Sequence, residues 1–150
     1  MEKKSILIVD DDRAILKSLG EILQLRGYNV DTAETGREAI EKSKSRFYNL
    51  MLLDIKLPDM EGTELLKAVD DTLPKMIKIM VTGYPALENA VESLNLGADA
   101  YLMKPIDPKE LLEVVEKKLK EQEEAEIMDA EKVKRWIKTR VQRLKMGESE

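Results

Sequence analysis

The 150-residue sequence contains no cysteine and no histidine. Without cysteine, the chain has neither disulfides nor thiolate metal sites. Without histidine, it has no Ser-His-Asp triad, no imidazole zinc site and no phosphohistidine of its own. Aromatic residues are also scarce, at 4% of the sequence. The chemistry of this chain must therefore come from Asp, Glu, Lys, Thr, Ser and Tyr side chains.

Long apolar runs are missing as well, and no stretch approaches the roughly 20 residues that a membrane-spanning helix needs. We therefore expect no membrane span and a cytoplasmic location. The sequence is 43% hydrophobic and 37% charged, which is typical of a helix-rich globular domain. Its length suggests one domain with a short appendage. The net charge of −5 argues against nucleic-acid binding by the whole chain.

Short apolar runs alternate with segments whose apolar residues recur at helical spacing. The runs cover 6–9, 30–33, 50–53, 77–81 and 100–103, and the helical segments cover 15–23, 35–44, 65–69, 86–94 and 111–119. This alternation predicts an α/β fold with a parallel sheet and helices on both faces. The most apolar runs, 6–9 and 50–53, belong in the middle, and the polar run 30–33 belongs at an edge. We expect the flavodoxin-like doubly wound (βα)5 sheet, order 2-1-3-4-5.

Polar residues follow four of the predicted strands, and these strand ends share one edge of a parallel sheet. They are Asp10 to Asp12, Asp54, Thr82 and Lys104. Each alone is as typical of a solvated loop or a helix cap. Together, crowded carboxylates repel one another until a proton or a cation relieves the repulsion. Oxygen ligands of this kind favour Mg²⁺ over Zn²⁺, and a carboxylate beside a cation can act as a nucleophile on phosphorus.

Four motifs carry a family resemblance: Ile8–Asp12, Leu53–Gly62, Val81–Tyr84 and Met103–Pro105. In this order they resemble the receiver domain of two-component response regulators, and the chain looks chemotaxis-regulator-like over roughly residues 4 to 120. The resemblance implies a phosphorylation-dependent signalling switch. It would accept a phosphoryl group from a sensor histidine kinase or phosphotransfer protein, and would not be an enzyme beyond this self-catalysed transfer and slow autodephosphorylation.

The same resemblance implies roles for the acidic residues. Asp54 would be the phosphoacceptor. Asp11 and Asp54 would contact Mg²⁺ directly, Asp10 would act mainly through water, and the backbone carbonyl of Lys56 would add a metal ligand. Asp12 lies one place past this acid pair, so we assign it to capping or to the loop.

The resemblance also implies how the switch responds. Thr82 would hydrogen-bond the phosphoryl group, and Lys104 would pair with it. Tyr101 would change rotamer when Thr82 moves, and the face formed by the fourth helix, fifth strand and fifth helix would then bind a downstream protein target. The Lys104–Pro105 bond resembles the cis peptide of the family.

We place the receiver domain at residues 1–122 and a C-terminal helical extension at 123–150. Residues 120–126 are helix-prone, and Asp129 is expected to cap a separate last helix that is amphipathic and basic. Its apolar face would consist of Val133, Trp136, Ile137, Val141 and Leu144.

Three interpretations of the last helix stay open. It packs back on the receiver or pairs with another copy as a homodimer; it docks a separate protein; or it binds a membrane surface or nucleic acid. No recognisable effector domain follows residue 122, so we expect the signal to leave through protein contacts, without direct DNA binding.

Two alternative functions also stay open. Asp10-x-Asp12 after a first strand resembles the nucleophile motif of haloacid-dehalogenase-type phosphatases, which would make Asp10 the phosphorylated residue and leave the Asp54 motif unexplained. A pseudo-receiver would keep the fold without being phosphorylated. The presence of all the expected acceptor, metal and charge-pairing residues weighs against that second alternative.

Overall fold

The computed structural model describes residues 3–69, 75–83 and 97–147 of the chain. Five parallel strands form one sheet in the order β2-β1-β3-β4-β5. The strands are β1 (Ser5–Val9), β2 (Asn29–Ala33), β3 (Leu50–Asp54), β4 (Ile77–Thr82) and β5 (Ala100–Met103). The predicted sheet order is therefore confirmed, with β1 and β3 in the middle and the more polar β2 at an edge.

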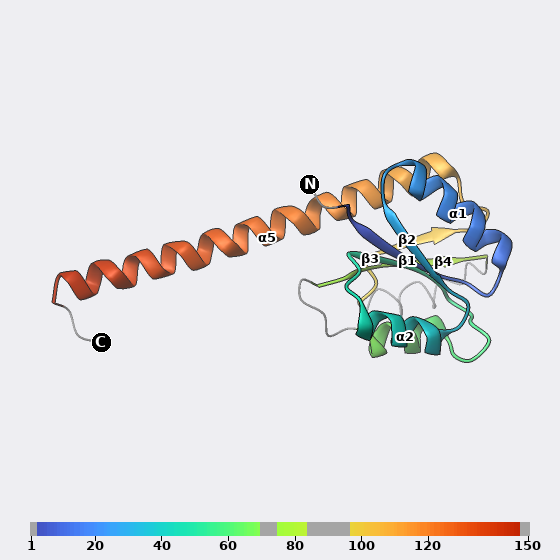
Figure 1. Cartoon of the computed structure of the whole chain (residues 1–150), viewed down its shortest axis with the longest axis horizontal. Helices are drawn as coiled ribbons and strands as arrows, with labels where there is room; N and C mark the ends of the chain where they lie inside the picture. Colours follow the sequence, from blue (N-terminus) through green and yellow to red (C-terminus); the bar gives the residue numbers. More distant parts are fainter. Residues whose placement is uncertain (1–2, 70–74, 84–96, 148–150) are drawn as a thin grey trace.

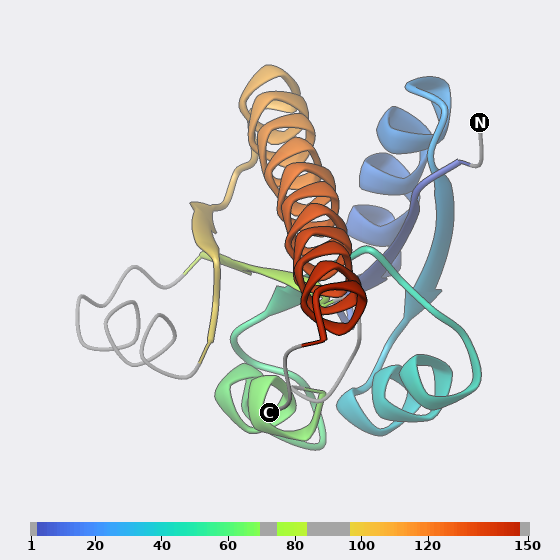
Figure 2. The same cartoon turned by 90° about the vertical axis from the view of Figure 1, so that its left-hand side faces the viewer.

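Helices cover both faces of this sheet (Figures 1 and 2). They are α1 (Arg13–Leu25), α2 (Gly36–Ser45), α3 (Gly62–Ala68) and α5 (Pro108–Lys145). The predicted helix over 86–94 lies outside the described residues. Within the described parts of the chain, no helix is both long enough and apolar enough to cross a bilayer.

Alternate residues of the central strands enter two separate cores, because successive strand side chains point to opposite faces of a sheet. Ile6, Ile8 and Leu52 belong to the core beneath α1 and α5. Leu7 and Leu53 belong to the core beneath α2 and α3. Both faces of β1 and β3 are therefore dry, which explains why the sequence of these strands is apolar at almost every position.

The first two helices begin at residues whose side chains cap them. Asp12 accepts hydrogen bonds from the backbone N–H groups of Ala14 and Ile15, so its predicted capping role is confirmed. Thr35 caps α2 in the same way. The chain leaves α1 through Gly27, whose φ of 96° lies in the left-handed region that favours glycine.

Helix α5 is longer than the sequence suggested. It runs without a break from Pro108 to Lys145, so the prediction that Asp129 caps a separate last helix is wrong. Residues 120–126 contain no glycine or proline that could end the first helix, and strong helix formers carry it onward. The interpretation that the last helix packs back on the receiver is wrong too, because residues 123–147 are all exposed and the helix projects outward (Figure 1).

Gln122 is the last buried residue of α5 and anchors the helix where it leaves the sheet. Its amide nitrogen donates to the backbone carbonyls of Asn49 and Lys75, at 3.0 and 2.9 Å. Its amide oxygen accepts from the side chain of Asn49, which in turn accepts from the backbone N–H of Ser5. One glutamine thus joins α5 to the beginnings of three strands.

Candidate functional site

The polar residues singled out in the sequence lie at the carboxyl ends of four strands. Asp10 directly follows β1, Asp54 ends β3, Thr82 ends β4, and Lys104 follows β5. The parallel register sets these strand ends level with one another, since Asp54 pairs with Val81 and Thr82 pairs with Met103. The topology therefore gathers the residues into one site at the edge of the sheet, at the switch point between β1 and β3.

Three carboxylates form the centre of the site. One carboxylate oxygen each of Asp10, Asp11 and Asp54 lies within 4.8 Å of the others. Asp10 and Asp54 are buried, at 3% and 8% exposure, whereas Asp11 is exposed. Such a set of hard oxygen atoms, open to solvent on one side, fits a divalent cation that keeps some of its water.

Lys104 supplies the positive charge that faces this cluster. Its ammonium lies 2.8 Å from Asp10 Oδ2 and 3.2 Å from Asp54 Oδ2, and its side chain is 22% exposed. The backbone N–H of Lys104 also donates to the carbonyl of Thr82, which ties the end of β5 to β4. The Lys104–Pro105 peptide is cis, as the resemblance suggested.

The electrostatics follow from burial and from these contacts. Burial raises the pKa of the Asp54 carboxyl, and the pull of Lys104 in the opposite direction does not cancel the rise. Burial lowers the pKa of Lys104, but its hydrogen bond to Asp10 and the charge of both carboxylates outweigh that effect, so the pKa is raised overall. Lys104 therefore stays a cation beside Asp54.

Thr82 and Tyr101 lie on the neighbouring strands. Thr82 is fully buried at the end of β4. Tyr101 lies on β5 and packs against the core beneath α2 and α3. Its hydroxyl is buried and has no hydrogen-bond partner among the described residues, which is a costly arrangement for a phenol.

Lys56 and Asp12 lie close to the acidic cluster without adding a carboxylate to it. The backbone N–H of Lys56 lies 3.4 Å from Asp54 Oδ1. The backbone N–H of Asp12 donates to Asp10 Oδ1 at 2.9 Å, which fixes the Asp10 side chain. The side chain of Asp12 is turned away to cap α1.

Two residues that position the site were not recognised from the sequence. A Cβ on Gly62 would meet the backbone oxygen of Asp54 at 2.4 Å, so only glycine lets α3 begin this close to β3. Asp59 accepts from the backbone N–H groups of Gly36 and Arg37, at 2.8 and 2.9 Å, and so ties the loop after Asp54 to the start of α2. Both residues lie within the motif Leu53–Gly62, but their partners at Asp54 and at the start of α2 leave no local signal in the sequence.

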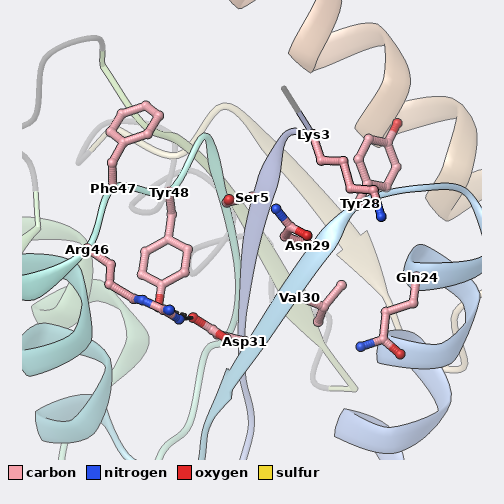
Figure 3. A pocket seen from close by; sticks show the side chains of 10 residues that line it. All are labelled: Lys3, Ser5, Gln24, Tyr28, Asn29, Val30, Asp31, Arg46, Phe47 and Tyr48. Carbon is pink, nitrogen blue, oxygen red and sulfur yellow. Dashed lines mark hydrogen bonds and ion pairs between the residues drawn. The ribbon is translucent and has the colours of Figure 1, made fainter. Parts of the chain in front are cut away.

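Two hollows differ in their relation to the site. One of about 490 Å³ adjoins Lys104 and is largely apolar, lined by Ala14, Ile15, Ser18, Leu19, Lys104, Pro105 and Ile106. Another of about 790 Å³ lies over the β2 edge and the loop before β3 (Figure 3). In it, Tyr48 and Arg46 both bind Asp31, at 2.6 and 2.5 Å, which fastens that loop to β2. None of the acidic cluster lines this second hollow.

The fold and the cluster define a known class of protein. The sequence profile of the response regulator receiver domain matches residues 6–116. The chain therefore belongs to the response regulator receiver family, the phosphorylation-controlled signalling module of two-component systems.

Particular relatives agree with this assignment. A crystal structure of a CheY-like response regulator receiver domain protein from Methanospirillum hungatei JF-1 has a TM-score of 0.80 and 57% identity, over 83% of this chain and 99% of that one. A response regulator from Burkholderia pseudomallei, solved with a phosphorylated aspartic acid, calcium ion and citrate, has a TM-score of 0.72 and 27% identity, over 85% and 75% of the two chains.

A full-length relative is much longer than this chain. The transcriptional regulatory protein ZraR of Escherichia coli O157:H7 is 38% identical over 126 residues, which are 84% of this chain and 28% of ZraR. The chain thus spans little more than a quarter of that relative, and the match concerns the receiver part alone.

Proposed function

We propose that this chain is a phosphorylation switch that accepts a phosphoryl group from a histidine kinase or phosphotransfer protein on the carboxylate of Asp54. The observation that carries the proposal is the pairing of one cation, Lys104, with two buried carboxylates, Asp10 and Asp54. Asp54 is both held in place and kept next to a positive charge, which is what a carboxylate nucleophile for a phosphoryl group requires. The Burkholderia pseudomallei relative, which carries a phosphorylated aspartic acid, supports this choice of residue type.

The transfer step can be written from the residues of the chain. A carboxylate oxygen of Asp54 attacks phosphorus and forms a new O–P bond as the P–N bond of the donor phosphohistidine breaks. The imidazole nitrogen leaves with the electron pair. Lys104 moves from its carboxylate contacts to the phosphoryl oxygens, and its charge offsets theirs. Thr82, at the end of the adjacent β4, donates its hydroxyl to one of those oxygens.

Asp10, Asp11, Asp54 and the backbone carbonyl of Lys56 would hold Mg²⁺. The three carboxylates fit such an ion because their oxygen atoms already lie within 4.8 Å of one another and one of the three is exposed. When bound, the ion supplies charge neutralisation for the phosphoryl oxygens. The Asp12 N–H keeps Asp10 oriented toward the cluster.

The response of the surface follows from Thr82 and Tyr101. When the Thr82 hydroxyl turns toward the phosphoryl group, the ring of Tyr101 on the neighbouring strand would change rotamer in response. The buried hydroxyl of Tyr101 has no hydrogen-bond partner among the described residues, so no hydrogen bond to them holds the ring in one rotamer. We propose that the β5 and α5 face then binds a downstream protein target. The expectation that this chain does not bind DNA directly remains a prediction.

The apolar hollow beside Lys104 is where we expect the phosphodonor protein to dock. It lies between α1 and the loop after β5, and it leads directly to the ammonium that faces Asp54. Ile15 and Ile106 are partly buried there and offer an apolar contact surface. Docking at this point would bring a phosphohistidine to Asp54 without passing through the core.

The phosphatase alternative is disfavoured by a specific contact. It needs Asp12 as a second acid in the site, but the Asp12 carboxylate accepts hydrogen bonds from the N-terminus of α1. The pseudo-receiver alternative is left to experiment.

The test is intact mass after incubation with Mg²⁺ and acetyl phosphate, compared between the native chain and Asp54→Asn. Asp107→Asn, at the cap of α5, is the matched control, because it makes the same chemical change away from the site. We expect the native chain and the control to gain one phosphoryl group only when Mg²⁺ is present, and Asp54→Asn to gain none.

Other results would overturn the proposal. A gain that persists in Asp54→Asn and disappears in Asp10→Asn would favour the phosphatase alternative. No gain in the native chain, with the fold intact and a cognate histidine kinase also tried, would favour the pseudo-receiver.

A further inference from the structure

The exposed part of α5 continues the helix face that packs on the sheet. We call the sheet, the helices packed on it and α5 up to Gln122 the body. Within the body, the packed face of α5 is formed by Leu111, Val115, Leu119 and Gln122. Spacing of four and three residues carries the same face onward through Glu126, Asp129, Val133, Trp136, Arg140 and Arg143. We call residues 123–145 the extension and the six residues just named its seam. In the single chain, the seam faces solvent.

The middle of the seam is apolar. Val133 and Trp136 are 56% and 62% exposed, and Ile137 beside them is 50% exposed. Large apolar side chains at this density on a single solvated helix are unfavourable unless something covers them. A helix in water also gains most of its stability from packing such a face.

The charged residues of the exposed part of α5 are divided into an acidic half and a basic half. Residues 121–131 contain six acidic residues and no basic one, whereas residues 132–145 contain seven basic residues and no acidic one. The seam shares this division, with Glu126 and Asp129 before Val133, and Arg140 and Arg143 after Trp136. The Arg140 guanidinium lies 5.4 Å from the centre of the Trp136 ring.

We infer that two copies of this chain pair through their extensions as an antiparallel helical pair. When Val133 of one copy lies level with Trp136 of the second, Asp129 lies level with Arg140 and Glu126 with Arg143. Each opposite-charge contact occurs twice, because the pair has two-fold symmetry and closes on itself. A parallel pair would instead set Asp129 against Asp129 and Arg140 against Arg140, which is repulsive.

The junction of the body and the extension suits the same arrangement. A hollow of about 360 Å³ lies where α5 leaves the sheet. Met76, Ile77 and Ala125 give it apolar walls. Its charged lining consists of four carboxylates, from Asp99, Glu121, Glu126 and Asp129, against two lysines, Lys75 and Lys118, so acidic groups are in excess. In the antiparallel register, residues 143–147 of the second copy reach this hollow. They bring Arg143, Lys145 and the 75% exposed side chain of Met146.

The first measurement is sedimentation equilibrium of the full 150-residue chain over a range of concentrations. We expect a monomer–dimer equilibrium. Asp129→Arg places an arginine level with Arg140 of the second copy in both symmetry-related contacts. The repulsion should weaken dimerisation at least about tenfold. Asp129→Arg with Arg140→Asp restores opposite charges in the antiparallel register and should recover most of the lost affinity.

Glu131→Arg is the matched control for Asp129→Arg. It makes the same change of charge in the same acidic half, but residue 131 lies about 200° around the helix from residue 129, away from the seam. We expect this control to have a much smaller effect. All these positions are exposed, so circular dichroism and thermal unfolding should show that the body is unchanged.

Orientation is measured directly with a spin label. Because the chain has no cysteine, Glu124→Cys gives a single labelling position. In the antiparallel pair, the two labels lie about 30 Å apart or more, since residue 124 lies level with residue 145 of the second copy. In a parallel pair, the two labels lie at the same level on the outer faces, about 20 to 25 Å apart, the width of two helices.

The pairing is independent of phosphorylation at Asp54, so either proposal can fail without the other. A chain that stays monomeric at high concentration would overturn the inference, as would a dimer with the short label distance or one that Asp129→Arg does not weaken. A monomer whose basic half binds a DNA duplex would instead assign the extension to nucleic acid.

Discussion

One helix, α5, passes through two different environments. Up to Gln122 it lies on the sheet and buries one face, and from residue 123 onward every described residue is exposed. The spacing of its residues is the same in both parts, so the helix period alone does not decide burial. What decides burial is whether a complementary apolar surface lies opposite the helix. The sheet provides this surface up to Gln122, and no described residue provides it for the extension.

The largest expected effect comes from making the same Leu→Ala substitution in the packed part and in the exposed part of α5. Leu119 is 4% exposed and Leu144 is 68% exposed, and both lie on the packing side of α5. We expect Leu119→Ala to lower the free energy of unfolding by about 3 kcal/mol, because it removes buried contacts and leaves a cavity. Leu144→Ala should change it by less than about 0.5 kcal/mol at concentrations where the chain is monomeric. Urea unfolding measures both. Equal effects would mean that the extension packs on the body.

A second matched pair concerns function. Lys104 contacts two buried carboxylates, whereas Lys138 is exposed in the extension. We expect Lys104→Met to slow phosphorylation by acetyl phosphate about 100-fold, because a preorganised cation is lost from the transferring group. Lys138→Met should leave the rate unchanged. A similar rate in both variants would remove Lys104 from the proposed mechanism.

The third comparison is between two glutamines of α5, the buried Gln122 and the exposed Gln142. Gln122→Ala leaves the Lys75 carbonyl and the Asn49 side-chain amide without this partner, so we expect it to cost about 2 kcal/mol of unfolding free energy. Gln142→Ala, on the exposed part of the same helix, should cost less than about 0.5 kcal/mol. The midpoints of urea unfolding decide between a structural anchor and a passive surface residue.

The smallest effect is expected at the β2 edge and depends on pH. Burial and the hydrogen bond to Asp31 raise the pKa of Tyr48 to about 12, so the folded state favours the neutral phenol. This stabilisation is fully present below pH 10, the ordinary pKa of tyrosine, and is lost as pH rises toward 12. We expect Tyr48→Phe to lower the free energy of unfolding by about 1 kcal/mol at pH 8. The difference from the native chain should shrink between pH 10 and 12, and a constant difference would contradict it.

The sequence was sufficient for the fold because the signals involved are local and repeated. The buried strands β1 and β3 are apolar at almost every position, and the polar residues of the site lie at or directly after strand ends. Parallel topology then places the carboxyl ends of the strands at one edge of the sheet. It therefore brings Asp10, Asp54 and Lys104 together although they are far apart in the chain.

The parts that were missed depend on distant partners. Gln122 lies in a polar stretch that looks solvated, and its burial depends on Asn49, which is 73 residues away. The bond from Asp59 to the start of α2 likewise spans 23 residues. The prediction at Asp129 failed for the opposite reason. Aspartate favours the N-cap position of a helix, but no nearby residue interrupts α5, so the helix continues through Asp129.

The unbroken course of α5 also gives the molecule a mechanical property. The helix begins a few residues after Lys104 and is held at Gln122, so it forms a rigid lever with its pivot at the edge of the sheet. The arm beyond the pivot is about 34 Å long, and a tilt of about 5° would carry its tip through about 3 Å. A displacement too slight to notice beside the acidic cluster would thus be magnified at the far end of the chain.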